Sequence, residues 1–288
     1  MNIENLYDKY KPLLFAIAYR MTGSAADAED MVQDTFLGAQ ELDAGHVSNI
    51  KAYLCKMVTN RCIDYLKSAR KRRELYVGNW LPEPLILSED DPLLTVERNE
   101  TLSYAFLVYL EKLTPVERAL FILREAFDYD YTDLADLVGK SEASCRQIIS
   151  RLKKKQQLDA APHVWAGDST NSELAERFMH ASSTGNMELL IRSLTEDVVL
   201  YSDGGGKVIA AINPIQGRER VVKFLIGIGA KASPDRTYRI VNMNGQHAIL
   251  VRERGAVITA IQWEADRQGC IRQLFFVRNP DKLPTGGR

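Results

Sequence analysis

The sequence lacks any apolar run near the ~20 residues that a membrane-spanning helix needs. Its first residues, Met1-Asn2-Ile3-Glu4, also lack the basic start and the apolar core of a secretory signal peptide. Both absences argue against membrane proteins and secreted proteins. We therefore expect a cytoplasmic protein that makes no membrane contact.

Cysteine is scarce. The four cysteines, Cys55, Cys62, Cys145 and Cys270, form no CxxC pair and have no histidine at the spacing of metal ligands. Cys62 and Cys145 fall on the apolar stripes of expected helices, which favours reduced cysteines in a core. We expect neither a metal ion nor a cofactor.

Net charge is almost absent, at −1, but the charges are unevenly distributed. Residues 61–73 hold six basic side chains against Asp64 alone, and residues 140–155 hold six against Glu142 alone. Two separate basic patches favour two contacts with a polyanion such as DNA. Cations also gather at solvated helix ends, so charge alone leaves both interpretations open.

Patterns of helix and strand divide the chain into five segments. Residues 1–75 and 93–157 have helical periodicity, and residues 171–288 mix helices with short strands. Residues 76–92 and 158–170 are interpreted as linkers, since Pro, Gly and small or acidic residues interrupt the pattern there. The sequence predicts a multi-domain protein with two all-α domains followed by an α+β domain.

Cap residues locate individual helices in the first two domains. Gly23 and Ser24 are interpreted as a helix stop and the next N-cap, and Ser48 as the cap of a helix that runs to about Arg70. The segment Thr114–Glu117 combines a capping box with Pro at the first helical position, which is a strong helix start.

The second helical segment ends in the pattern of a helix-turn-helix. Two short helices are expected near residues 131–138 and 142–155, with Gly139 ending the first and Ser141 capping the second. The second helix is strongly basic. A tight turn with Gly before a basic helix is typical of a DNA-binding helix-turn-helix.

The last domain is expected to be a helix-covered sheet. Ser172–Leu194 predicts a pair of helices and Arg218–Ile228 a further helix. The expected strands are Val198–Tyr201, Lys207–Ala211, Tyr238–Asn242, His247–Arg254, Ala256–Ala265 and Ile271–Val277. Helices packed on one face of a curved antiparallel sheet would give this α+β domain.

At this point the residues resemble a known family. Ala28–Phe36, with the sequence AEDMVQDTF, resembles region 2 of extracytoplasmic-function (ECF) sigma factors, and the segment that runs from Leu113–Arg118 through Ser150–Lys153 resembles their region 4. The C-terminal part is similar to the SnoaL-like domains of the NTF2-like superfamily, which are cone-shaped. One group of ECF sigma factors carries this extension in place of a separate anti-sigma partner.

Three motifs mark that group, and each is present here in order. They are a Trp-Leu-Pro-Glu-Pro linker, an Asp-Gly-Gly-Gly-Lys turn and an Asn-Pro-Asp-Lys-Leu tail. The regulatory residues that the resemblance implies are Trp80, Leu81, Pro82, Glu83, Pro84, Asp203, Gly204, Gly205, Gly206, Lys207, Asn279, Pro280, Asp281, Lys282 and Leu283.

The resemblance implies an initiation factor with no catalysis of its own, which brings core RNA polymerase to promoter DNA. The basic helix of region 4 would enter the major groove at the minus-35 element. Arg reads guanine and Gln reads adenine, each worth about 1–3 kcal/mol of discrimination, whereas Ser and Lys suit phosphates. The expected contacts are Ala143, Ser144, Arg146, Gln147, Ser150, Arg151 and Lys154.

Region 2 would supply two further contacts. One helix face would hold the melted minus-10 strand with cations near a base pocket. Its residues are Asn60, Arg61, Asp64, Lys67, Arg70 and Lys71. An acidic face of another helix, Asp27, Asp30, Gln33 and Asp34, would dock on the β′ clamp of core polymerase, while region 4 would meet the β flap.

The fusion suggests a hypothesis for regulation. The C-terminal domain would dock against both sigma domains and the Trp80–Pro84 linker and fix their spacing. Residues 1–160 carry 21 basic and 25 acidic side chains and residues 161–288 carry 16 and 13, so the charges are weakly complementary. Taken alone, Asp203–Lys207 is a flexible glycine turn and not a P-loop, and whether the domain inhibits or assists stays open.

Two other classes of function stay open. A one-component transcription regulator would use the helix-turn-helix without polymerase and the C-terminal cone as a ligand sensor. An enzyme with a DNA-binding appendage would use Asp197, Asp203, His180 or His247, although no two of these have the spacing of a catalytic dyad.

Overall fold

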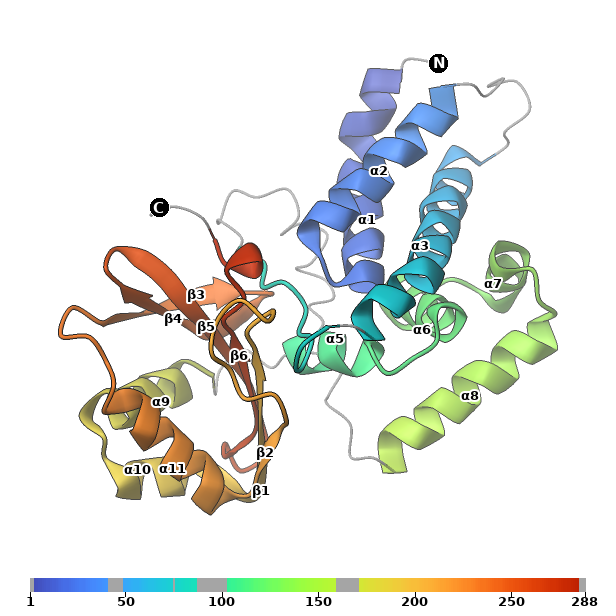
Figure 1. Cartoon of the computed structure of the whole chain (residues 1–288). Helices are drawn as coiled ribbons and strands as arrows, with labels where there is room; N and C mark the ends of the chain where they lie inside the picture. Colours follow the sequence, from blue (N-terminus) through green and yellow to red (C-terminus); the bar gives the residue numbers. More distant parts are fainter. Residues whose placement is uncertain (1–2, 41–48, 75, 87–102, 159–170, 285–288) are drawn as a thin grey trace. The chain divides into compact units, whose positions relative to one another are not determined.

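The protein forms two compact units. The computed structural model describes residues 3–40, 49–74, 76–86, 103–158 and 171–284 (Figure 1). The helical unit comprises residues 1–74, 89–102 and 106–162, and the C-terminal unit comprises residues 75–88, 103–105 and 163–288. The linker around Trp80 thus belongs to the C-terminal unit. Within the described residues, no helix is both long and apolar enough to cross a membrane.

Three long helices begin the helical unit: α1 (Ile3–Thr22), α2 (Ala25–Gln40) and α3 (Ile50–Glu74). The stop at Gly23 is confirmed by its φ of 69°, and Ser24 caps α2 by accepting the N–H of Asp27 at 3.3 Å. Ser48 lies outside the described residues. The side chain of Asn49 instead accepts the N–H of Ala52 at 3.1 Å, so α3 has its cap one residue later than predicted.

Four helices follow in the region-4 segment: α5 (Tyr104–Leu110), α6 (Pro115–Phe127), α7 (Tyr131–Val138) and α8 (Glu142–Leu158). The capping box at Thr114 is confirmed, with both reciprocal bonds to Glu117 present. Gly139 ends α7 with a φ of 66°, and the Ser141 hydroxyl accepts the N–H of Ser144 at 3.3 Å. The predicted helix-turn-helix is therefore confirmed as α7 and α8.

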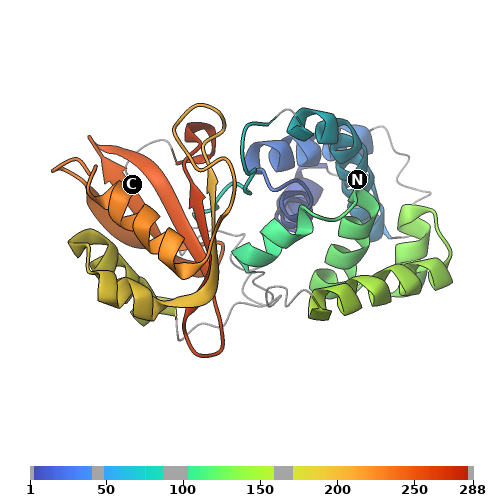
Figure 2. The same ribbon diagram turned by 60° about the horizontal axis from the view of Figure 1, so that its bottom comes forward.

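The C-terminal unit is the expected α+β domain. Its helices are α9 (Asn171–Thr184), α10 (Met187–Ser193) and α11 (Arg218–Gly229), and its strands are β1 (Leu194–Asp203), β2 (Ile215–Gln216), β3 (Thr237–Met243), β4 (Gln246–Glu253), β5 (Ala256–Ala265) and β6 (Ile271–Val277). A short 3-10 helix, η2 (Pro280–Lys282), follows. The three helices cover one face of the sheet (Figures 1 and 2). Its apolar core lies between them, with Phe178 of α9 against Trp263 of β5.

The sheet differs from the prediction in two respects. Its strand order is β2-β1-β6-β5-β4-β3, and β1 pairs with β6 in parallel, so the sheet is mixed. The long connection from β1 to β6, which contains α11 and four strands, allows this parallel pairing. The predicted strand Lys207–Ala211 was wrong, because Gly205 and Gly206 take positive φ and fold the chain into a turn; β2 begins later.

Candidate nucleic-acid interface and linker-binding site

The exposed face of α8 carries the predicted minus-35 residues. On the other side of the helix, Cys145, Ile149 and Leu152 are buried against the unit. This alternation leaves the polar side chains together in solvent. Ser144 is half-buried, and the exposed members are Ala143, Arg146, Gln147, Ser150, Arg151 and Lys154.

Two arginines of this face already have partners. Arg146 stacks 4.2 Å from the ring centroid of Tyr131 and donates to Glu142 at 3.2 Å, and Arg151 pairs with Glu117 at 2.5 Å. Burial opposes ionisation of Glu117, but hydrogen bonds from Thr114 together with Arg151 outweigh it and lower its pKa. Both arginines remain more than half exposed, at 58% and 65%, so each ion pair contributes at most about 1 kcal/mol.

The predicted minus-10 face lies on α3. Asn60, Asp64 and Lys67 are exposed, whereas Arg61 is half-buried and reaches Asp34 of α2 at 3.8 Å. Lys67 pairs with Asp64 at 2.8 Å. The side chains of Arg70 and Lys71 lie outside the described residues, so the structure brings together four of these six side chains.

The acidic face of α2 is also present. Asp30, Gln33 and Asp34 are exposed and Asp27 is half-buried, opposite the buried Ala28, Val32 and Phe36. Sequence reasoning missed Leu37, which is 61% exposed next to this face. Its signal was a large apolar residue off the buried stripe of the helix.

Within the helical unit, a buried arginine joins region 2 to region 4. Arg118 of α6 is 3% exposed, and its Nη1 donates to the carbonyl of Met21 at the end of α1 at 2.6 Å. The same nitrogen pairs with Glu111 at 2.6 Å. Helices α1 and α3 both contact α6, and α3 contacts α7. The predicted DNA-contacting faces of α3 and α8 therefore belong to modules that pack on one another.

In the C-terminal unit, residues of all three predicted motifs meet at one buried carboxylate. Asp203 at the end of β1 is 0% exposed. One oxygen accepts the hydroxyl of Tyr76 at 2.6 Å and the N–H of Gly205 at 3.0 Å. The other accepts the N–H of Leu81 at 2.9 Å and the ammonium of Lys282 at 2.8 Å. We call these residues and Asn279 the Asp203 cluster.

Lys282 holds the linker from the other side. Its ammonium also donates to the carbonyl of Leu81 at 2.6 Å and lies 4.0 Å from the ring centroid of Trp80. A cation over an indole face is attractive, and more so where water is excluded. The side chain of Lys282 is only 11% exposed, so the ammonium has exchanged water for the carboxylate, the carbonyl and the ring.

Asn279 completes the cluster. Its amide donates to the Tyr76 oxygen at 3.0 Å, and its backbone N–H donates to the Asp203 carbonyl at 2.8 Å. Its side-chain oxygen accepts the N–H of Asp281 at 3.1 Å, which starts η2. Burial, followed by the hydrogen bond and negative charge of Asp203, raises the pKa of Tyr76 well above its ordinary value.

The glycines of the turn are required by close packing. A Cβ on Gly204 would lie 2.4 Å from the carbonyl oxygen of Val208, and one on Gly205 would lie 2.5 Å from the Asn279 side chain. Gly205 also has a φ of 64°. Lys207 closes the turn on its solvent side by pairing with Asp281 at 2.7 Å. This turn is a packed element of the cluster and not merely a free hairpin.

The rest of the linker is also bound within this unit. Leu81, Pro82 and Pro84 are buried and Glu83 is half-buried. The carbonyl of Leu85 accepts the N–H of Asn244 at 2.8 Å, its N–H donates to the Asn244 side chain at 3.2 Å, and Ile86 forms an antiparallel bridge with Met243 at the end of β3.

Tyr104, at the start of the region-4 segment, meets the same surface. Its hydroxyl donates to the carbonyl of Pro82 at 2.6 Å, and its ring lies edge-on to Phe275 with centroids 5.4 Å apart. Its N–H donates to the side chain of Gln246 at 2.9 Å. Sequence reasoning missed Tyr76, Asn244, Gln246 and Tyr104; an aromatic residue beside the Trp80 linker was the only signal for the first of these.

Comparison with known proteins agrees with this arrangement. Residues 6–72 match the family model of Sigma-70 region 2, and residues 103–155 match that of Sigma-70, region 4. The chain is 32% identical to the ECF RNA polymerase sigma factor SigJ of Mycobacterium tuberculosis, over 96% of this chain and 92% of that protein. This chain is an ECF RNA polymerase sigma factor.

Two further comparisons concern relatives of this sigma factor. A probable ECF RNA polymerase sigma factor of M. tuberculosis, SigI, is 28% identical over 74% of this chain and 72% of its own length. The crystal structure of M. tuberculosis SigJ superposes with a TM-score of 0.77 at 28% identity, covering 96% of this chain and 97% of that chain. The likeness therefore extends through the C-terminal unit.

As a member of this family, the sigma factor directs RNA polymerase to promoters, and the interpretation as a one-component regulator is set aside. Asp203 is occupied by the linker, and none of the four residues considered for catalysis lines the cavity of about 570 Å³ between the sheet and α11. Within the described ranges, no three His, Cys, Asp or Glu side chains are grouped to hold a metal ion.

Proposed function

We propose that this sigma factor is controlled by its own C-terminal unit, which holds the linker between region 2 and region 4. The observation that carries the proposal is the Asp203 cluster, where the linker, the glycine turn and the tail meet. Because a buried ionic group without its partner is costly, the cluster favours a single docked arrangement of the linker.

The contacts with promoter and polymerase follow the expected assignment. The exposed face of α8 would read the minus-35 element and that of α3 the melted minus-10 strand. The acidic face of α2 would dock on the β′ clamp, with Leu37 adding apolar area, and region 4 on the β flap. Such a factor acts on promoter DNA in the cytoplasm, and nothing in this role needs a catalytic residue.

A length argument links the cluster to regulation. The two promoter elements lie about 25 base pairs apart by their names, or on the order of 85 Å along the duplex. A packed unit of about 150 residues has a radius of gyration of only about 15 Å. The contact through Arg118 and Met21 must therefore open before α3 and α8 reach both elements.

The docked linker withholds the chain length that this opening needs. Residues 76–86 would span up to about 40 Å if released and extended. While Tyr76, Leu81 and Leu85 are held within the C-terminal unit, this length cannot be used. Release would lengthen the tether and let the second promoter contact form at a favourable effective concentration.

A truncation series with run-off transcription tests this proposal. Removing residues 279–288 deletes Asn279 and Lys282 from the cluster and is expected to raise transcript yield from purified core polymerase. The matched control removes residues 285–288 only and is expected to leave the yield unchanged. Removing everything after Ala160 tests whether the C-terminal unit also assists transcription by core polymerase. If neither of the two longer truncations changes the yield, the C-terminal unit does not regulate this factor.

A further inference from the structure

The C-terminal unit also contains a cavity that takes no part in binding the linker. The cavity between the sheet and α11, which we call the cone cavity, has a volume of about 570 Å³. Apolar side chains form most of its lining, among them Phe178, Leu225, Val251 and Phe276. Volumes of about 300–1,000 Å³ with an apolar lining and few polar groups are typical of small-molecule sites.

The charged groups of the cone cavity are mostly cationic. Lys231, Arg236 and Arg278 line it, with Glu253 as the one acidic residue. Arg236 is already ion-paired with Glu253. Neither Lys231 nor Arg278 has a carboxylate at ion-pair distance within the described part of the chain. Two cationic side chains are therefore left for an external anion.

Arg278 is the stronger of the two candidates. Its guanidinium donates to the carbonyl of Ile209, which is its hydrogen-bond partner among the described residues. Burial, and then the charge of Arg236, lower its pKa from the usual value and outweigh the opposing charge of Glu253. A guanidinium binds a carboxylate with two parallel hydrogen bonds, so a carboxylate matches this group.

The segment 208–212, of which Ile209, Ala210 and Ala211 line the cavity, adds apolar surface. Ile209 is 90% exposed, and its neighbours Val208 and Ile212 are also exposed. Ser182 contributes a buried hydroxyl with no partner among the described residues. The apolar lining, the exposed apolar side chains of the 208–212 segment and the guanidinium of Arg278 together suit an amphipathic carboxylate. We propose that the cone cavity binds an amphipathic monocarboxylate, with the ligand's carboxylate on Arg278 and its apolar body against Phe276 and Val251.

The ligand site is connected to the linker, a step that rests on the proposed function. The backbone N–H of Arg278 donates to the carbonyl of Asp203 at 2.7 Å, while its guanidinium holds Ile209. Ala211 also lines the cavity, and the next carbonyl, that of Ile212, accepts the side chain of Asn79 at 3.2 Å. A ligand carboxylate would compete with Ile209 for Arg278 and loosen the segment that receives Asn79.

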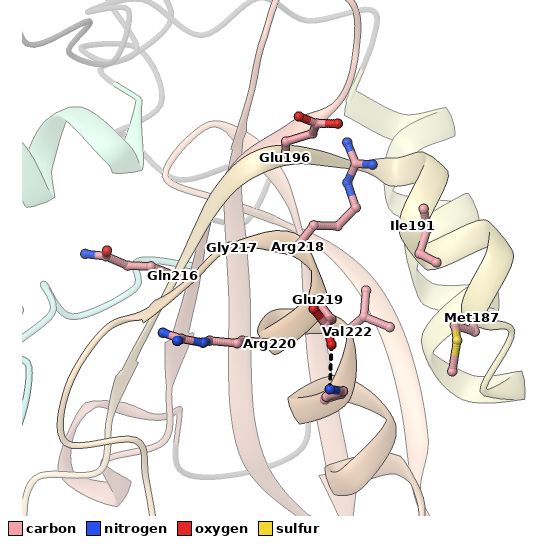
Figure 3. Close-up of a pocket in the computed structure, with 10 residues that line it drawn as sticks. Met187, Ile191, Glu196, Gln216, Gly217, Arg218, Glu219, Arg220 and Val222 are labelled. Carbon is pink, nitrogen blue, oxygen red and sulfur yellow. Dashed lines mark hydrogen bonds and ion pairs between the residues drawn. The ribbon is translucent and has the colours of Figure 1, made fainter.

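A second pocket lies at the start of α11, and one of its residues, Arg220, serves as the control for Arg278 (Figure 3). There Glu219 pairs with Lys223 at 2.6 Å, and Arg218 donates to the carbonyl of Thr195 at 3.4 Å. Arg220 extends away from Met187 in this view. It carries the same charge as Arg278 in the same unit but does not line the cone cavity.

Titration calorimetry of the full chain with dodecanoate, below its micelle concentration, tests the site. We expect one saturable site, at least tenfold weaker binding for Arg278→Gln, and binding within about threefold of natural for Arg278→Lys, which keeps the charge. Arg220→Gln should bind as the natural chain does, and dodecan-1-ol at least tenfold more weakly than dodecanoate. No saturable binding, equal binding of the alcohol, or equal losses in both Arg278 variants would overturn the proposal.

Hydrogen exchange of the 76–86 peptide tests the connection. Saturating dodecanoate is expected to speed exchange there at least threefold in the natural chain and to have no effect in Arg278→Gln. Binding without faster exchange would refute the connection and leave the site standing. Unchanged transcription in the truncation series would refute the proposed regulation but not dodecanoate binding, so the two failures are distinguishable.

Discussion

The two functional regions of this sigma factor use charge in opposite ways. On the predicted contact faces of α8 and α3 most of the described charged side chains are exposed, and ion pairs such as Arg146 with Glu142 can be exchanged. At Asp203 the charges are buried and every oxygen is occupied within one unit. Exposed pairs contribute about 0–1 kcal/mol, whereas breaking a buried pair costs about 3–5 kcal/mol. Substitutions should therefore affect binding in the first region and stability in the second.

Removing the buried carboxylate is the strongest challenge to this contrast. Asp203→Ala leaves the Lys282 ammonium buried without its counter-charge and should lower the free energy of unfolding by about 3–5 kcal/mol. Urea denaturation measures this. Lys207→Gln removes the exposed pair with Asp281 and should cost no more than about 1 kcal/mol. Equal effects of the two substitutions would contradict the contrast.

The glycine turn gives the next largest effect. Gly205→Ala adds a Cβ against Asn279 at a positive φ and should cost about 2–4 kcal/mol, from backbone strain plus overpacking. Gly255 also has a positive φ, but a Cβ there meets nothing within 4 Å. Gly255→Ala should therefore cost only about 1–2 kcal/mol. Thermal unfolding of both variants separates the cost of backbone strain from the cost of overpacking. If Gly205→Ala lost no more stability than Gly255→Ala, the turn would be able to move aside for the added Cβ.

On the exposed side the effect should fall on binding alone. Arg146→Ala is expected to weaken promoter binding of the holoenzyme by about 1–3 kcal/mol and to change the unfolding free energy by less than about 1 kcal/mol. Lys153, which pairs with Glu125 off the predicted face, provides the control. Gel-shift titrations with core polymerase compare the two. A larger loss from Lys153→Ala would mean that α8 presents a different face to DNA.

The smallest predicted effect concerns the hydroxyl of Tyr76. Tyr76→Phe removes one hydrogen bond to Asp203 and should cost about 1–2 kcal/mol at pH 7. Since folding raises the pKa of Tyr76, its contribution is complete below the ordinary value of about 10 and is lost as pH rises above it. Urea denaturation of both chains should converge between pH 9 and about pH 11. A constant difference across that range would place the phenol outside the cluster.

Sequence determined much of the helical unit because its signals are local. Thr114, Gly139 and Ser141 mark helix ends within a few residues of their own position, and the alternation around Cys145 separates the buried face of α8 from the exposed one. The motifs also named Asp203 and Lys282 among the regulatory residues, without pairing them. By contrast, Val208 and Ile209 led to a wrong strand prediction, since an apolar pair beside glycines has the same composition in a strand and in an exposed turn.

What only the tertiary structure decided is which groups meet across long stretches of chain. Tyr76 and Asn279 are 203 residues apart, and Asn244 reaches Leu85 only because the end of β3 lies beside the linker. Residues 75–88 belong to the C-terminal unit although region-2 and region-4 sequences flank them. A buried polar group needs a hydrogen-bond partner, and the tertiary fold decides which residue lies close enough to be that partner. Neither the periodicity of the sequence nor the spacing of its motifs identifies that residue.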